Sequence, residues 1–248
     1  TCTSMCAQVF MDADVDPTVL SGAELPSMGG AFRIGEKEHF IFEACEYMDS
    51  FLDFNPTVAI LLGAELEHVD YFKDMEQIRE SFARFASLTG SEGITVVNAD
   101  DEDILESAGR ALTRGKTGRI IRFSAEGKES ADFYARSIRT EEGLPCFELM
   151  AHGESWGDVR MAVPGRHQVI NALAAAAAME GGVEILHQLA DIVACMDDGI
   201  FVVASFAAEH GAAAIAPLAD GIAKAAHHRI DILRITSKIL FAIEAQRI

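Results

Sequence analysis

The sequence predicts an α/β fold with three layers, built around a mainly parallel, doubly wound sheet. From residue 39 to residue 123, apolar segments with the length of buried strands alternate with segments of helical spacing. Beyond about residue 130 the pattern changes to short strands separated by turn residues, which indicates a small antiparallel edge sheet. A partial βαβ unit is expected in the tail of the chain.

The first two thirds of the chain supply the parallel sheet and its helices. Residues 57–62 form a continuous apolar run of the kind found in parallel sheets. Residues 74–87 place Met75, Ile78 and Phe82 on one stripe, which predicts a helix. Residues 1–10 resemble the first turns of a helix, and the glycine-rich segment 22–35 resembles a loop. The other expected elements are a short extended run at 17–20, strands at 39–44, 94–97 and 118–123, and a helix at 101–112.

The last third divides into an edge sheet, a long helix and a tail. Short strands are expected at 133–138, 146–150 and 159–163. A helix should begin near Arg166, after Pro164 and Gly165, and end at Gly181 and Gly182. We therefore expect one domain over residues 1–183. Residues 184–248 should form a helical linker (184–196) and a possible partial Rossmann-like domain, with a helix at 212–226 between strands at 200–204 and 229–235.

Composition limits the classes of partner. The chain carries 39 acidic and 20 basic residues, a formal net charge of −19, which repels nucleic acid and anionic membrane. No apolar run approaches the roughly 20 residues of a membrane-spanning helix, and no secretory leader is visible. The five cysteines form no CxxC pair, which favours free thiols in a reducing cytosol over a disulfide framework. We expect a cytoplasmic protein without nucleic-acid or membrane partners.

Two acidic clusters follow neighbouring predicted strands. Glu43, Glu46 and Asp49 come at the end of the 39–44 strand, where open α/β sheets place their ligand crevice. The segment 65–70, which contains His68, follows the next strand. Carboxylates with an imidazole suit a divalent ion that bridges phosphates. A solvated acidic loop is the alternative interpretation.

A third cluster lies at the start of the last helix. Gln168 and Asn171 are one turn apart and could clasp a flat heterocycle such as a purine, and His167 precedes them. A capped helix N-terminus explains the same residues. Thr1, at the start of the first helix, could cap that helix or lie beneath a bound phosphate.

Taken together, these segments resemble the Mur ligases, which join amino acids to cell-wall precursors. The resemblance covers about residues 1–182, the ATP-binding central domain of such enzymes. Its most specific parts are Glu-Ala-Cys-Glu-Tyr at 43–47, followed by Ser-Phe-Leu at 50–52, and the run from Pro164 to Ala176. The other matching stretches are residues 1–5, 16–30, 55–60, 68–72 and 97–100.

The resemblance implies a reaction, cofactors and substrates. Mur ligases use ATP and Mg²⁺ to convert a carboxylate into an acyl phosphate, which an amine then attacks. The pattern is most similar to the branch that joins L-alanine to UDP-N-acetylmuramate in peptidoglycan synthesis. Glu43 would hold the magnesium between the β- and γ-phosphates, and His68 the second magnesium. Asn171 and Gln168, with His167, would clasp adenine, and Thr1 would follow the phosphate-loop lysine and threonine.

Several departures accompany the resemblance. The family's phosphate loop, GTHGKT, and its uridine-nucleotide domain do not occur in this sequence. In the second acidic motif, Gly63 replaces asparagine, Ala64 replaces isoleucine and Glu67 replaces aspartate. We expect a truncated chain that is inactive in isolation. A degenerate, non-catalytic nucleotide-binding module of the same fold is the alternative. A sister ligase that adds peptides or glutamates is disfavoured by the 43–47 motif.

Overall fold

The computed structural model describes residues 1–12, 15–35 and 39–193. Its helices are α1 (Cys2–Asp12), α2 (Met75–Ser87), α3 (Glu102–Thr113) and α4 (His167–Val193), with short 3-10 helices η1 (Pro26–Met28) and η2 (Tyr47–Asp53). Its strands are β1 (Thr18–Leu25), β2 (Gly30–Arg33), β3 (Phe40–Phe42), β4 (Val58–Leu61), β5 (Gly90–Asn98), β6 (Thr117–Ser124), β7 (Phe133–Glu141), β8 (Leu144–Ala151) and β9 (Glu154–Arg160).

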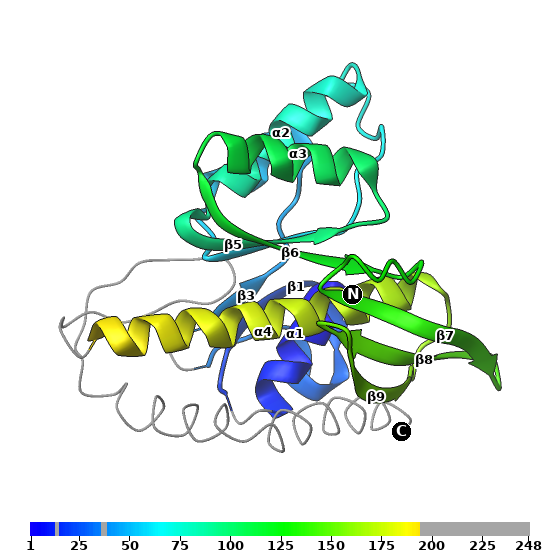
Figure 1. Ribbon diagram of the computed structural model, residues 1–248. Coiled ribbons are helices and arrows are strands. Elements are labelled where there is room, and N and C mark those ends of the chain that lie inside the picture. Colours follow the sequence, from blue (N-terminus) through cyan, green and yellow to red (C-terminus); the bar gives the residue numbers. More distant parts are fainter. Residues whose placement is uncertain (13–14, 36–38, 194–248) are drawn as a thin grey trace.

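The strands form two sheets between two layers of helices. The larger sheet has the order β4-β5-β6-β7-β8-β9 and is parallel from β4 to β7. The smaller has the order β2-β1-β3, with β1 parallel to β3. Figure 1 shows α2 and α3 on one side of the large sheet and α1 and α4 on the other. The predicted three-layer α/β fold is confirmed, although the antiparallel strands β8 and β9 extend the large sheet instead of forming a separate one.

One predicted neighbour relationship is wrong. Residues 39–44 and 57–62 were expected to be adjacent strands of one sheet, but they provide β3 and β4, which are end strands of different sheets. A cavity of about 150 Å³ lies between them, lined by residues of both strands. Strands that follow each other in sequence need not be adjacent in space, and this pair is separated by the width of the cavity.

The glycine-rich segment 22–35 is mostly a hairpin and not the predicted loop. β1 continues to Leu25 and pairs with β2, with Leu25 opposite Gly30. Gly29 adopts a φ of 71°, which glycine allows at no steric cost. Here the hydrogen-bonded ladder outweighs the weak strand preference of glycine. The last antiparallel strand also begins earlier than predicted, at Glu154, because the turn at His152 and Gly153 reverses the chain at once.

The predicted end of the last helix at Gly181 and Gly182 is wrong, because α4 continues to Val193. Gly181 is buried, and a Cβ there would lie 3.2 Å from the Cδ1 atoms of Ile94 and Ile121. The glycine therefore allows α4 to approach β5 and β6 closely, and does not end the helix. The elements predicted after residue 193 lie outside the described residues.

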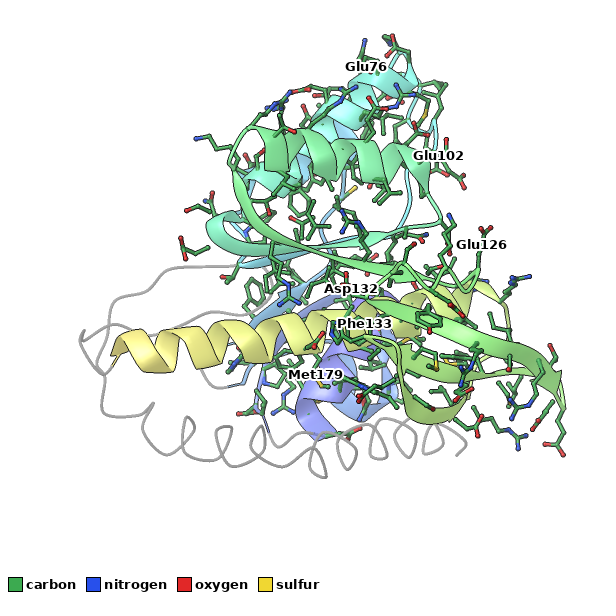
Figure 2. The ribbon with its side chains drawn as sticks, in the orientation of Figure 1. Glu76, Glu102, Glu126, Asp132, Phe133 and Met179 are labelled. Atoms are coloured by element: carbon green, nitrogen blue, oxygen red, sulfur yellow. The ribbon has the colours of Figure 1, made fainter. Side chains whose placement is uncertain are left out.

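Two apolar clusters hold the layers together. One fills the space between the sheets and the α1/α4 layer, where Phe133 is fully buried; Figure 2 shows Phe133 and Met179 on this side. The other lies under α2 and α3, whose N-termini are capped by the side chains of Asp74 and Asp101. Cysteines 2, 6, 45 and 146 are free thiols, as predicted, and Cys195 lies outside the described residues. Within residues 1–12, 15–35 and 39–193, no helix has the length and apolar character needed to cross a membrane.

Candidate active site

Glu43 follows β3 directly and is held by β1. Its backbone N–H donates to the carbonyl of Leu20 (3.1 Å), and its Oε2 accepts from the N–H of Gly22 (3.1 Å). A Cβ on Gly22 would lie 3.1 Å from the carboxylate, so the glycine permits this close approach. The Glu43 side chain is thus exposed at the carboxyl end of its strand, where open α/β sheets bind ligands.

Glu46 and His68 connect the loops that follow β3 and β4. The Nε2 atom of His68 lies 3.1 Å from Oε1 of Glu46, and both side chains are about one third exposed. The two residues are 22 positions apart and follow strands of different sheets. This contact brings the two acidic clusters of the sequence together at one edge.

Glu67 completes a group of three potential metal ligands. One donor atom each from Glu46, Glu67 and His68 lies within 4.8 Å of the others. They line a pocket of about 360 Å³ with Gly63 and Glu65, against an apolar wall that includes Phe72 and Phe82. Two carboxylates and an imidazole suit a divalent cation. The resemblance had assigned the magnesium ions to Glu43 and His68, and had counted Glu67 as a departure from the family motif.

Two tyrosine–aspartate pairs fasten η2 to the turn that carries His68. The hydroxyl of Tyr47 donates to Oδ2 of Asp70 (2.7 Å), and the hydroxyl of Tyr71 donates to Oδ2 of Asp49 (3.0 Å). The hydrogen bond from Tyr47 lowers the pKa of Asp70, and the same contact raises the pKa of Tyr47. The Tyr47 ring also packs against the imidazole, with 4.6 Å between ring centroids.

The backbone of these two loops is unusual. Met48, Asp49 and His68 have φ values of 55°, 58° and 50°, in the left-handed region that non-glycine residues rarely adopt. Asp49 is held there by the hydroxyl of Ser81 and by Nη1 of Arg84 (3.1 Å), both on α2. Strained conformations of this kind persist where surrounding contacts fix them, and they concentrate at functional sites.

The loop after β4 is held by one side chain from the end of β5 and one from the start of α3. Asn98 donates through Nδ2 to the carbonyl of Leu62 (2.9 Å). Asp101 accepts from the N–H of Ala64 (2.9 Å) with the same carboxyl group that caps α3. A Cβ at Gly63 would lie 3.4 Å from Asp101, an ordinary contact distance. Gly63 therefore changes the side chain that borders the pocket, and the backbone at this position does not require a glycine.

The three polar residues at the start of α4 contact one another. Nδ2 of Asn171 donates to Oε1 of Gln168 (3.1 Å), and Nε2 of Gln168 lies 3.0 Å from Nε2 of His167. Gln168 and Asn171 are each 9% exposed. The structure brings these predicted residues together on one helix turn.

Thr1 precedes α1 and is exposed. Its carbonyl accepts from the N–H of Met5 (3.0 Å), and its side chain borders a mainly apolar cavity of about 250 Å³. The α4 residues in that lining include Ala172 and Ala175, whereas Gln168 and Asn171 are not part of it. The start of α1 nevertheless meets the α4 cluster one residue later, where Sγ of Cys2 lies 3.8 Å from the carbonyl oxygen of Asn171.

Fold and site together define a three-layer α/β domain with an acidic, histidine-bearing crevice at the carboxyl ends of its strands. The chain belongs to the Mur ligase family, because residues 1–179 match the Mur ligase middle domain.

The curated relatives carry one common name. The chain is 38% identical over 174 residues to the UDP-N-acetylmuramate–L-alanine ligase of Clostridium botulinum (strain Alaska E43) and 40% identical over 186 residues to that of Caldicellulosiruptor bescii. These matches cover 70% and 74% of this chain, and 36% and 39% of the relatives. The chain thus spans less than two fifths of the length of the curated relatives it matches.

Solved structures share the fold. A Neisseria ligase described as UDP-N-acetylmuramate:L-alanyl-γ-D-glutamyl-meso-diaminopimelate ligase matches with a TM-score of 0.61 and 26% identity, over 75% of this chain and 59% of its own. The UDP-N-acetylmuramate–alanine ligase of Thermotoga maritima matches with a TM-score of 0.59 and 21% identity, over 73% and 38%.

Proposed function

We propose that this chain is the ATP-binding domain of a cytoplasmic UDP-N-acetylmuramate–L-alanine ligase of peptidoglycan synthesis. The observation that carries the proposal is the meeting of Glu46, Glu67 and His68 at the carboxyl edge where Glu43 also emerges. The names of the curated relatives support the choice of UDP-N-acetylmuramate and L-alanine as substrates.

The donor set fits magnesium. Ligand atoms about 3 Å apart are neighbours in an octahedral shell with bonds of about 2.1 Å, which matches the 3.1 Å between Glu46 and His68. Bound magnesium would neutralise charge on the transferring phosphates and on the acyl phosphate. Glu43 would hold one ion and His68 the second, with Glu46 and Glu67 as further protein ligands of the second ion.

The chain's own residues would orient the nucleotide. The side-chain amides of Gln168 and Asn171 each offer N–H donors and a carbonyl acceptor, which match the donor and acceptor pattern of a purine edge. Their mutual hydrogen bond fixes the amide planes before a nucleotide binds. His167 would flank the base, and Thr1 would lie next to the phosphates at the N-terminus of α1, where the helix dipole favours an anion.

A degenerate nucleotide-binding module is the second candidate. Gly63 and Glu67 favour it, because both replace motif residues beside the proposed metal. The lengthened side chain of Glu67 nevertheless brings its carboxylate within reach of Glu46 and His68. That convergence favours a retained cation site.

A chimera tests the proposed activity. Residues 1–179 of this chain replace the matching segment of the Clostridium botulinum ligase, and phosphate release is measured with ATP, Mg²⁺, UDP-N-acetylmuramate and L-alanine. We expect release that depends on both substrates and is lost in His68→Ala. The matched control is His152→Ala, which removes a histidine bonded to Glu180 on α4.

A thermal melt accompanies each chimera. A folded chimera that binds Mg²⁺ and ATP but releases no phosphate would contradict the ligase proposal and favour the non-catalytic module. Phosphate release at the wild-type rate in His68→Ala would remove His68 from the active site.

A further inference from the structure

The mainly apolar cavity of about 250 Å³ lies apart from the acidic crevice. It is bounded by α1, α4, β8 and β9, with the end of β1 at its border (Figure 1). It shares no lining residue with the pocket that contains His68, and Gln168 and Asn171 do not line it. Of the proposed site residues, only Thr1 borders it. A large apolar cavity with a few polar groups is the usual form of a small-molecule site, and the proposed function gives this one no ligand.

The walls of this cavity suit a flat aromatic molecule. Trp156 of β9 lines it and is half-buried, with its indole set against the ring of Phe133 at 5.5 Å between centroids and 84° between planes. The thioethers of Met5 and Met161 also line it, and polarizable sulfur makes favourable contacts with aromatic rings. Ala176 contributes a wall from α4 that has no bulky side chain. A planar ring can therefore lie against the indole.

The polar groups of the cavity favour a cation that carries N–H donors. Nε2 of Gln8 donates to Oδ1 of Asp12 (3.0 Å), and the amide oxygen of Gln8 has no hydrogen-bond partner in the part of the chain that the structure describes. Glu24 lines the same cavity and is exposed. None of the described residues in the lining is Lys, Arg or His. The formal net charge of −19 adds to this preference, because it attracts cations and repels anions.

Trp156 supplies a second attraction for positive charge. The face of an indole attracts a cation more strongly than the face of any other side-chain ring. We propose that this cavity binds a planar aromatic cation, stacked on Trp156, with amino groups that donate to Glu24 and Gln8. The proposal uses no metal ligand and no residue of the purine clasp, so it holds whether or not the domain is catalytic.

Three probes with one ring system test the proposal on the full 248-residue chain. The first is 9-aminoacridine, which is a cation at neutral pH. Acridine is its uncharged counterpart, and acridine-9-carboxylate is the anion. Trp156 is the single tryptophan of the chain, so quenching of tryptophan fluorescence reports binding beside it. We expect saturable quenching, with 9-aminoacridine bound most tightly and the anion most weakly.

Variants separate the cavity from the rest of the surface. Ala176→Leu narrows the cavity from α4 and should weaken binding of 9-aminoacridine at least about 10-fold. Val163→Phe narrows it from the segment after β9, and serves if the first variant does not fold. Glu24→Gln should weaken binding of the cation about 2- to 5-fold, as expected for an exposed ion pair, and leave acridine unaffected. The matched control is Glu92→Gln, which removes the same charge from an exposed residue of β5 outside the cavity.

Four results would overturn the proposal. Unchanged affinity in a folded cavity-filling variant would place the probe elsewhere. Equal affinities for the cation and the anion would contradict the charge preference. Equal effects of Glu24→Gln and Glu92→Gln would assign that preference to the net charge of the chain and not to the cavity. Absence of quenching by all three probes would mean that the cavity does not admit an aromatic ring.

Discussion

The Nε2 atom of His68 lies 3.1 Å from Oε1 of Glu46, although the two residues follow strands of different sheets. In the described part of the chain, backbone hydrogen bonds do not pair these sheets. Contacts between side chains of the two loops therefore set the geometry of the proposed metal ligands. The strength of metal binding should depend on residues that never touch the ion.

Tyr47→Phe tests this dependence. The substitution keeps the ring beside His68 and removes the hydroxyl that donates to Asp70 at 2.7 Å. Loss of a group that orients a metal ligand typically weakens binding by roughly 10-fold or more. We expect that loss in Mn²⁺ affinity, measured by electron paramagnetic resonance, with little change in melting temperature.

Tyr71→Phe is the matched control. Its hydroxyl donates to Asp49, which keeps its contacts with Ser81 and Arg84 after the substitution. The effect on Mn²⁺ affinity should therefore be smaller than for Tyr47→Phe. Equal affinities in the wild type and in Tyr47→Phe would show that the tyrosine–aspartate pairs do not position the site.

Gly181 tests the packing of α4 on the large sheet. A Cβ there meets the flexible Cδ1 ends of Ile94 and Ile121 at 3.2 Å. In Gly181→Ala, the helix preference of alanine, about 1 kcal/mol, should offset this mild crowding. Gly181→Val adds two more methyl groups and should lower the free energy of unfolding by about 1–3 kcal/mol.

The control for this pair is Gly109→Ala in α3. No atom lies within 4 Å of a Cβ at Gly109, so alanine should stabilise the protein by about 1 kcal/mol. Chemical denaturation measures all three variants. A stabilising Gly181→Val would mean that α4 does not approach the sheet closely.

Local patterns in the sequence were sufficient to predict most of the helices and strands and their order along the chain. The predicted end of α4 was wrong because glycine can either end a helix or allow close packing within one. Only the contact of Gly181 with Ile94 and Ile121 distinguishes these two roles. The prediction that β3 and β4 are neighbours in one sheet was wrong because the order of strands in the sequence does not determine which strands pair.

The candidate site was predictable only in part. Glu43 and His68 lie in recognisable motifs, but the contact of Glu46 with His68 depends on left-handed backbone at Asp49 and His68. Aspartate and histidine adopt left-handed backbone more often than most other non-glycine residues, but neither prefers it to the ordinary conformations. Contacts with α2 and between the two loops maintain it, and such tertiary contacts are not visible in local sequence.

His39 should make stability depend on pH. It is 3% exposed and packs against Phe10, and burial lowers the pKa of its imidazole. The unfolded chain then binds a proton more readily than the folded one, so stability is retained above about pH 6.5 and is lost as the pH falls toward the lowered folded value. Denaturation at about pH 7.5 and pH 5.5 should show a larger loss of unfolding free energy in the wild type than in His39→Leu. Identical losses would mean that His39 is not buried in its neutral form.

The most direct test of the central claim is a Mn²⁺ titration of the full chain, followed by electron paramagnetic resonance, with Glu46→Gln, His68→Ala and the control His152→Ala. If Glu46 and His68 share a cation, the wild type and His152→Ala should bind one ion with the same affinity. Each site variant should bind it at least about 10-fold more weakly while keeping its melting temperature. Unchanged Mn²⁺ affinity in both folded site variants would contradict the claim that the loops after β3 and β4 form a metal site.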